Sequence, residues 1–342
     1  MLLVILGAGA SYDSAPSRPP NDGNYSNLPN RPPLANELFG DRPYFGEVMN
    51  KYPRCLSIIP RLRHISEQSS VEVELQKLQA EATAYSERYC QLAAIRYYLQ
   101  DILWDCGGRW MTETHHVSNY LTLVDDIKRW KKPGDRVCFV TFNYDNLLDL
   151  ALRRTGYPFT ELSAYTARDL MLVKLHGSVN WARMVRTPFD ENAQVNRVEL
   201  ATRLIDQYPI LDISRDFVLI GEYPPSPRIK KPVFPALAIP VEEKLDFECP
   251  AEHVEALKSF LPNVTKILVI GWRATEKPFL EILKSGLGGR NPDITIVNGL
   301  SDNSQVAANN LQKVGITGKF RILNEGFTDF IRRDSGRVFL SS

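Results

Sequence analysis

The sequence predicts an α/β fold, with a Rossmann-like, mostly parallel sheet and helices on both faces. Short apolar runs such as Leu2–Leu6 lack the alternation of a half-exposed strand, and they therefore indicate strands buried on both faces. Many of these runs are separated by stretches with helical spacing, which is typical of parallel strands joined by helical crossovers. Small or polar residues directly follow several of the runs. Because ligands bind at the carboxyl ends of the strands in such sheets, these residues are the candidates for a functional site.

The composition restricts the functional class. With 342 residues, 44% hydrophobic and 24% charged, the chain can bury a large core, and its net charge of +1 gives no general basic surface for nucleic acid or an anionic membrane. Its five cysteines are scattered without a Cys-x-x-Cys pair, which argues against a disulfide framework and a Cys-rich zinc site. No apolar run approaches the ~20 residues of a membrane span, and no leader is evident. We therefore expect a cytoplasmic protein without a metal, a membrane anchor or direct nucleic-acid binding.

The N-terminal third begins with the strand 2–6 and a glycine turn. Residues 12–34 are rich in Pro, Asn and Ser and have almost no apolar periodicity, so we expect a mobile flap over a ligand. Residues 45–132 are predicted to form a helical module inserted between the first two strands. In the stretch 71–82, for example, apolar residues recur every three to four positions, which is typical of an amphipathic helix.

The remainder alternates strands and helices around one exception, the stretch 183–235, which is polar and is predicted to be an irregular insertion. Proline at position 278 suits the first turn of a helix. No internal repeat is evident, so residues 1–342 are interpreted as a single Rossmann-like domain carrying the two insertions. The expected strands are 137–142, 170–175, 236–240, 266–271, 294–298 and 320–323, and the expected helices are 147–152, 278–287, 303–314 and 326–333.

Five blocks at the ends of these strands resemble the sirtuin family of NAD-consuming domains. They occur in the order of the family, and each follows a predicted strand. The sirtuin counterparts are Gly-Ala-Gly-Ile-Ser, Thr-Gln-Asn-Ile-Asp, His-Gly, a late strand ending in Gly-Thr-Ser and a strand ending in Asn. The blocks in this chain are Gly7-Ala-Gly-Ala-Ser11, Thr141-Phe-Asn-Tyr-Asp145, His176-Gly177, Val269-Ile-Gly271 and Ile296-Val-Asn298.

The resemblance implies a role for each block. The glycine turn would carry the pyrophosphate of NAD, the Asn and Asp of the second block would line the nicotinamide and ribose pocket, and the Asn of the last block would contact the adenosine ribose. The catalytic residues implied are Asn143, Asp145 and His176. The cofactor-binding residues implied are Gly7, Ala8, Gly9, Ser11, Tyr144, Gly177, Gly271 and Asn298.

Three departures from the family pattern concern the substrate and one cofactor block. Sirtuin deacylases carry two Cys-x-x-Cys zinc pairs, which this chain lacks. They also present a Phe-Gly-Glu strand that clamps the acyl-lysine peptide, whereas residues 232–240 contain no Gly-Glu. Gly271-Trp272-Arg273 replaces Gly-Thr-Ser. NAD blocks without the apparatus for a protein substrate resemble the zinc-less, sirtuin-like NADases of bacterial anti-phage defence.

The residue types suit hydrolysis of NAD⁺, which is the substrate rather than a retained cofactor. Cleavage of the N-glycosidic bond passes through an oxocarbenium-like ribosyl cation and releases nicotinamide. Asp145 can stabilise that cation or bind the carboxamide, and Asn143 can orient the ribose hydroxyls and a water molecule. His176 titrates near neutrality and can relay a proton. The predicted products are nicotinamide and ADP-ribose.

Alternatives remain open at the level of the sequence. The chain is alternatively an NAD-dependent protein deacylase or ADP-ribosyltransferase, or a non-catalytic sensor of NAD or ADP-ribose. Asn143 alternatively caps the following helix, and Asp145 in a first helical turn would suit the helix dipole. His176 is alternatively a partly buried core residue. The adjacent His115 and His116 do not share a helix face and are interpreted as surface residues.

Control of the activity is expected to come from assembly, from a partner or from the flap at 12–34, because an unrestrained NADase would drain the cell. We expect a homo-oligomer with contacts through residues 45–132. The resemblance to stand-alone defence NADases also implies a separately encoded partner, such as a HerA-type hexameric ATPase.

Overall fold

The computed structural model describes residues 1–24, 28–65, 69–186, 196–220, 232–240, 247–299 and 301–341, without the side chains at 301 and 302. The chain divides into two compact units. The first unit contains residues 1–32, 107–176 and 244–342, and the second contains residues 33–106 and 177–243.

The first unit is built on a six-stranded parallel sheet, which confirms the predicted Rossmann-like α/β class. The strand order is β3-β2-β1-β7-β8-β9. From β1 the chain moves outward to β3, and from β7 it moves outward to β9 on the other side. The direction therefore reverses between β1 and β7, and a crevice at the carboxyl ends of these two strands is where such folds bind dinucleotides. The strands are β1 (Leu2–Leu6), β2 (Val137–Thr141), β3 (Leu170–Lys174), β7 (Lys266–Ile270), β8 (Asp293–Val297) and β9 (Lys319–Leu323).

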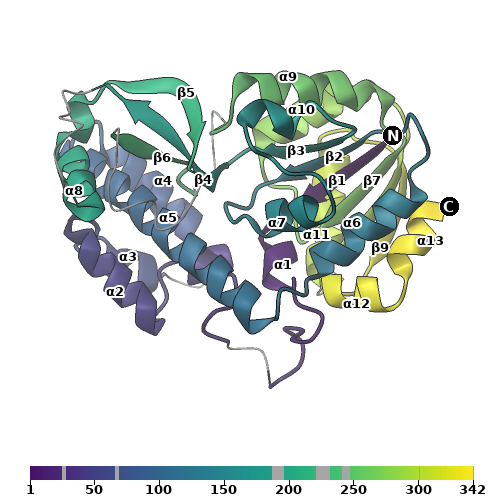
Figure 1. Cartoon of the computed structure of the whole chain (residues 1–342), viewed down its shortest axis with the longest axis horizontal. Coiled ribbons are helices and arrows are strands. Elements are labelled where there is room, and N and C mark those ends of the chain that lie inside the picture. The colour runs from purple at the N-terminus through teal and green to yellow at the C-terminus, as the bar shows by residue number, and fades with distance from the viewer. Residues whose placement is uncertain are drawn as a thin grey trace. The chain divides into compact units, whose positions relative to one another are not determined.

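Helices cover this sheet on both faces. Figure 1 shows α9 and α10 on one side of the strands and α6 and α7 on the other. Two of these helices have clear end signals: the Ser118 hydroxyl accepts from the Leu121 amide at the start of α6, and Gly288, with φ +56°, ends α10 in the left-handed region. The helices of the first unit are α1 (Ala8–Tyr12), α6 (Asn119–Trp130), α7 (Leu147–Arg154), α9 (Ala251–Phe260), α10 (Lys277–Leu287), α11 (Ser301–Lys313), α12 (Phe327–Arg332) and α13 (Ser335–Ser341).

The second unit combines helices with a small antiparallel sheet of order β5-β4-β6. Aromatic side chains form its core: Tyr98 stacks on Phe39 with ring centroids 5.5 Å apart, and Tyr97 meets Phe234 edge-on at 5.3 Å. Its elements are α2 (Pro43–Lys51), α3 (Ile59–Arg63), α4 (Val71–Glu81), most of α5 (Glu87–Glu113), β4 (Gly177–Val185), α8 (Arg197–Gln207), β5 (Ile213–Leu219) and β6 (Val233–Leu237).

Two segments differ from the sequence-based expectation. The stretch 45–132 is rich in helices as expected, but α6 and the end of α5 belong to the first unit. Within 183–235, where irregular structure is expected, the described residues form α8, β5 and most of β6. The apolar positions Leu200, Leu204 and Ile205 of α8 do follow helical spacing, but charged residues surround them and obscure the pattern.

Both ends of the predicted flap at 12–34 are anchored by side chains of the first unit. Arg31 is buried, and its guanidinium donates to the Tyr12 carbonyl at 2.6 Å and to the Arg18 carbonyl at 2.9 Å. The Trp110 indole donates to the Ser14 hydroxyl at 3.0 Å. Residues 25–27 of the predicted flap lie outside the described residues. The described start and end of this segment are therefore held by hydrogen bonds that are buried or partly buried.

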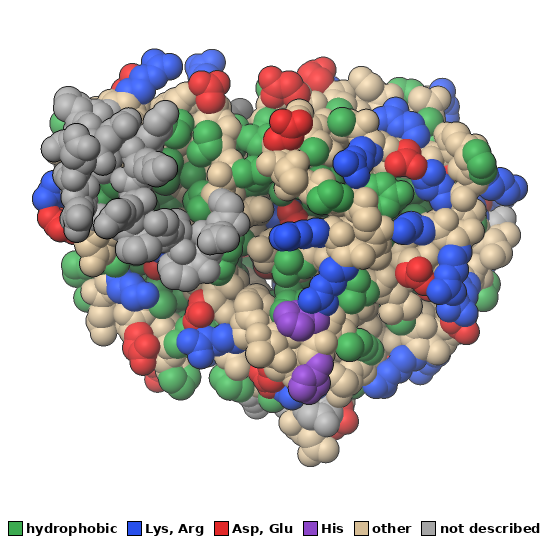
Figure 2. Space-filling view, in the orientation of Figure 1, with side chains coloured by type: hydrophobic (Ala, Val, Ile, Leu, Met, Phe, Trp, Pro, Cys, Tyr) green, Lys and Arg blue, Asp and Glu red, His purple; other side chains and the backbone are tan. Residues whose placement is uncertain are grey.

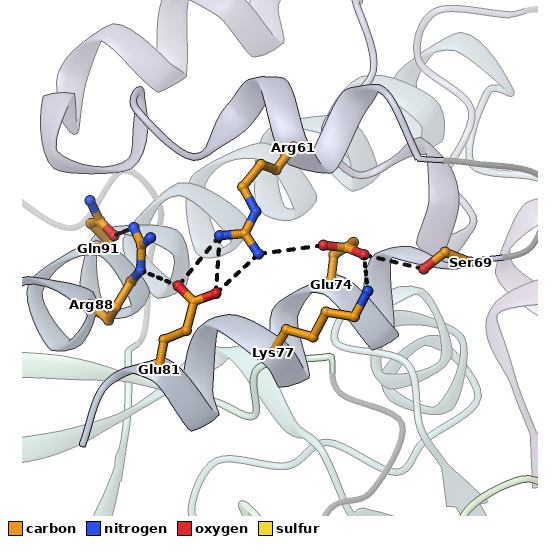
Figure 3. A network of polar contacts seen from close by, with 7 residues as sticks. All are labelled: Arg61, Ser69, Glu74, Lys77, Glu81, Arg88 and Gln91. Atoms are coloured by element: carbon orange, nitrogen blue, oxygen red, sulfur yellow. Dashed lines mark hydrogen bonds and ion pairs between the residues drawn. The ribbon is translucent and has the colours of Figure 1, made fainter. Parts of the chain in front are cut away.

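A network of ion pairs and hydrogen bonds joins α3, α4 and the start of α5 in the second unit (Figure 3). Arg61 lies at its centre, 3.6 Å from Glu74 and 3.2 Å from Glu81. The Arg61 hydrogen bond is the main reason why the pKa of Glu81 lies below its ordinary value. Because these groups are partly exposed, each pair contributes about 0–1 kcal/mol and mainly orients the helices. The side chains drawn are Arg61, Ser69, Glu74, Lys77, Glu81, Arg88 and Gln91.

The surface drawn in Figure 2 carries mixed charge, since Lys and Arg side chains lie among Asp and Glu side chains. Among the helices of the described residues, none is both long and apolar enough to cross a bilayer.

Candidate functional site

The register of the sheet brings the predicted strand ends to one edge. Leu6 pairs with Thr141 on one side and with Ile270 on the other, and Thr141 in turn pairs with Lys174. Because paired parallel strands end level, the loops that follow β1, β2, β3 and β7 emerge side by side. These loops carry Gly7–Ser11, Asn143–Asp145, His176 and Gly271.

Three of the predicted glycines lie at the point where β1 and β7 end. The Gly7 amide donates to the Ile270 carbonyl at 3.0 Å, and the Gly9 amide donates to the Gly271 carbonyl at 3.2 Å. A Cβ atom on Gly7 would lie 2.4 Å from the Gly271 carbonyl oxygen, and one on Gly271, whose φ is +64°, would lie 2.2 Å from the Ala10 nitrogen. The glycines therefore let two backbones touch at the reversal point. The amides of Gly7 and Gly9 already have partners within the protein, so phosphate binding by this turn stays a prediction.

Asn143 connects the loops after β1 and β2. Its side-chain nitrogen donates to the Gly7 carbonyl and to the Ser11 hydroxyl, both at 2.9 Å, and the residue is 8% exposed. It does not cap the next helix, because α7 begins only at Leu147. The capping alternative for Asn143 is therefore wrong, and the amide instead ties the two loops together. Its Oδ1 is the atom with which Asn143 can accept a hydrogen bond from a ligand.

Ser11 is the centre of a buried hydrogen-bonded group. Its hydroxyl lies 2.9 Å from the Tyr120 hydroxyl and also bonds the Asp145 carboxylate. A serine has one proton to give. When Ser11 donates it to Asp145, the Ser11 oxygen accepts from Asn143 and Tyr120, which satisfies all three neighbours. Sequence reasoning missed Tyr120, because it lies on α6, more than one hundred residues from Ser11, and reads there as an ordinary core aromatic.

Asp145 combines partial burial with a positively charged neighbour. Burial raises the pKa of the Asp145 carboxyl above its ordinary value, and the charge of Lys174 is the strongest effect that opposes this rise. Asp145 Oδ1 also accepts from the Leu147 amide at 3.0 Å. Asp145 itself lies two residues before α7, and the acid of the first turn is Asp149, so the alternative that places Asp145 in that turn is wrong. Its carboxylate instead accepts from the first amide of the helix, where negative charge suits the helix dipole, and it also contacts Ser11.

His176 lies among aromatic rings. Its ring centroid is 5.0 Å from that of Phe142 in an edge-on arrangement and 6.1 Å from that of Tyr144. Phe142 in turn stacks on Trp272 at 5.2 Å with an interplanar angle of 11°. His176 is 6% exposed, beside the two residues that flank Asn143 in sequence. The imidazole is therefore almost entirely removed from solvent. Trp272, which departs from the sirtuin pattern, joins this aromatic cluster through its stacking on Phe142.

Gly177 follows His176 and opens β4 in the second unit. Its φ is +83°, and a Cβ atom there would lie 1.9 Å from the Ala236 carbonyl oxygen of β6. Strand packing within the second unit therefore requires glycine at this position. The cofactor-binding role predicted for Gly177 stays a prediction, as does that of Ala8, the first residue of α1.

Asn298, at the end of β8, presents a buried acceptor. Its side-chain nitrogen donates to the Trp272 carbonyl at 2.8 Å and to the Asn303 carbonyl at 3.2 Å. Its Oδ1 has no hydrogen-bond partner among the described residues, and the same holds for Oε1 of Glu325 after β9. The Gly299 amide donates to the Glu325 carbonyl at 2.9 Å, which joins the two strand ends. Buried acceptors without protein partners are suited to ligand hydroxyl or amino groups. Sequence reasoning missed Glu325, since no block singles it out.

Within the described ranges of the chain, no three His, Cys, Asp or Glu side chains are grouped as a metal site requires, and the five cysteines are buried free thiols. The absence of a metal stays a prediction.

Comparisons with known proteins return only solved structures. No family model matches the chain, and no curated protein does. The chain is similar to a crystal structure of Sir2 with the inhibitor EX-527, 2′-O-acetyl-ADP-ribose and a deacetylated p53 peptide, at 12% identity over 97% of this chain and 91% of that chain, with a TM-score of 0.38. It is also similar to a structure described as the structural basis of sirtuin substrate affinity, at 13% identity over 97% of this chain and 92% of that chain, with a TM-score of 0.41. A third similar structure is a Sir2–p53 peptide–NAD⁺ structure, at 13% identity over 99% of this chain and 94% of that chain, with a TM-score of 0.38.

Proposed function

We propose that this chain is an NAD⁺ glycohydrolase that releases nicotinamide and ADP-ribose. The observation that carries the proposal is the buried group of Ser11, Asn143 and Asp145 at the reversal point of the sheet. Dinucleotides bind at this point in folds with this strand order. A carboxylate, an amide and a nearby imidazole are the groups that cleavage of a nicotinamide–ribose bond needs.

The reaction breaks the bond between the nicotinamide nitrogen and the anomeric carbon. The bonding electrons leave with the pyridinium nitrogen, so nicotinamide departs as a neutral molecule and positive charge develops on the ribose. The Asp145 carboxylate stabilises that charge. Oδ1 of Asn143 accepts from a ribose hydroxyl or the attacking water, because its Nδ2 is engaged with Gly7 and Ser11. His176 takes the proton that the water loses on bonding to the ribose.

The biological setting that we propose comes from the sequence motifs. The chain would be a zinc-less, sirtuin-like effector of anti-phage defence that depletes the cytoplasmic NAD⁺ pool. A separately encoded partner, such as a HerA-type hexameric ATPase, would control it.

The direct test is to incubate purified protein with NAD⁺ and to follow nicotinamide release by chromatography, with and without an acetyl-lysine peptide. Release without peptide supports hydrolysis. Release only with peptide contradicts the proposal and points to a deacylase or transferase. Binding of NAD⁺ measured by calorimetry, without release, points to a sensor.

Removal of divalent metals is expected to leave the activity unchanged, because the proposed chemistry uses only side chains of the protein. The measurement compares nicotinamide release before and after dialysis against a chelator. A loss of activity that returns on addition of Zn²⁺ or Mg²⁺ would contradict this expectation.

Activity is expected to depend on protein concentration, because we propose a homo-oligomer with contacts through residues 45–132. Light scattering paired with NADase assays over a dilution series tests this, and low activity of the isolated, dilute chain is expected. A fully active monomer at all concentrations would exclude control by self-assembly.

A further inference from the structure

Lys174 is a buried charge that the proposed mechanism does not use. It is the last residue of β3, and it is 0% exposed. Its ammonium donates to the backbone carbonyl of Asp145 at 2.6 Å and to Oδ2 of Asp149 on α7 at 2.9 Å. The other carboxylate oxygen of Asp149 accepts from the Tyr165 hydroxyl at 2.9 Å. Lys174 therefore fixes the loop between β2 and α7 at Asp145, which lies in the same loop as Asn143.

A buried ammonium is costly unless charge and hydrogen bonds compensate it. A neutral donor would suffice to satisfy the Asp145 carbonyl, and an apolar residue would suffice to fill the interior of the sheet. The positive charge at this position therefore calls for a reason beyond packing. The ammonium lies 2.6 Å from the backbone carbonyl oxygen of Asp145, so the carboxylate of the same residue lies within range of its charge, as does the carboxylate of Asp149.

We propose that Lys174 is a positioning residue of the candidate site, whose ammonium fixes the Asn143–Asp145 loop and keeps the Asp145 carboxylate negatively charged for its role in catalysis. The catalytic consequence rests on the proposed function, whereas the charge state of Asp145 does not. Asp149 holds Lys174 in place and balances part of its charge.

The neighbours of Asp145 act on its charge with opposite signs. Burial raises the pKa of Asp145, Lys174 lowers it most strongly among the neighbours, and Asp149 raises it. The hydroxyl of Ser11 and the Leu147 amide lower it by hydrogen bonding. The titratable groups near Asp145, element by element, are Tyr120 on α6, Asp149 on α7, Lys174 at the end of β3, Tyr165 beside Asp149, and Tyr144 and His176 in the adjoining loops.

Two single substitutions are therefore expected to move the titration of Asp145 in opposite directions. Lys174→Met removes the positive charge and should raise the pKa of Asp145 by about one unit or more, as the loss of a close opposite charge does. Asp149→Asn removes the competing negative charge and should lower it, while Asn can still accept from Tyr165. Lys174→Met combined with Asp149→Asn leaves no unpaired charge of this pair buried and should still raise the pKa, by less than Lys174→Met alone. A role in packing alone would not produce opposite shifts.

The experiment is a ¹³C NMR titration of the aspartate carboxyl signals in the full chain labelled with ¹³C-aspartate. The Asp145 signal is assigned by its loss in Asp145→Asn, and circular dichroism checks that each variant is folded. Should Lys174→Met alone fail to fold, the double variant and Asp149→Asn carry the test. The proposal is overturned if the titration of Asp145 is unchanged in the folded variants, or if Asp149→Asn shifts it in the same direction as the variants that lack Lys174.

NAD⁺ hydrolysis is measured on the same proteins as a separate readout. The acidic limb of the pH profile of kcat/KM should move with the Asp145 titration, to higher pH in the variants that lack Lys174 and to lower pH in Asp149→Asn. If no protein, wild type included, hydrolyses NAD⁺, the proposed function fails, while the NMR titration still decides the role of Lys174.

Discussion

Replacement of His176 or Asn143 by alanine is expected to lower the rate of NAD⁺ hydrolysis by about 100-fold or more, the usual loss for a positioned acid–base or orienting group. His176→Ala removes the group that takes the proton of the attacking water. Asn143→Ala removes the amide that joins Gly7 to Ser11 and the oxygen that would orient the ribose. The measurement is steady-state nicotinamide release, with the loss expected in kcat.

Matched controls are His115→Ala and His116→Ala. Both histidines are exposed in the turn that follows α5, outside the site, so their replacement should leave turnover near the wild-type value. Thermal melting of each variant separates a catalytic loss from a loss of folded protein. Wild-type turnover in folded His176→Ala would show that the assignment of this histidine is wrong.

Gly271→Ala is expected to cause a large loss of stability at the point where β1 and β7 end. The new Cβ would lie 2.2 Å from the Ala10 nitrogen and 2.5 Å from the Gly9 carbonyl carbon, which are backbone atoms that cannot rotate away. Overpacking and the left-handed backbone together should cost about 2–5 kcal/mol in the free energy of unfolding. The clash would force the backbone apart and separate the loops after β1 and β7, so we expect NAD⁺ binding to be lost as well.

Gly288→Ala is the control for the backbone conformation alone. Its φ of +56° is close to the +64° of Gly271, but the nearest atom to a Cβ there, the Ser285 carbonyl oxygen, is 4.0 Å away. We expect a cost of about 1–2 kcal/mol, from the left-handed region only. Denaturant unfolding followed by circular dichroism compares the two variants. If both variants lose the same free energy of unfolding, the close approach of the backbones does not explain why glycine is needed at position 271.

The candidate residues could be predicted from the sequence because they lie at or just beyond the end of an apolar run. Polar or glycine residues after such a run point to the end of a buried parallel strand, and the register confirms that these ends are level. Local spacing did not reveal the partners of these residues. Tyr120, Lys174 and Asp149 meet Ser11 and Asp145 only through the packing of α6 and α7 on the sheet. Nothing in their local sequence pattern singles out these three residues.

The sequence by itself determined the α/β class, the bounds of the six parallel strands to within about two residues and the set of strand-end candidates. Five of these strands are buried on both faces, which requires a mainly apolar run, whereas β9 is partly exposed. Only the tertiary structure decided that β1 lies between β2 and β7, since strand pairing over more than one hundred residues leaves no local pattern. The tertiary structure also shows the structural role of the glycines. Gly7, Gly9 and Gly271 meet backbone to backbone, and that contact exists only once both strands are side by side in one sheet.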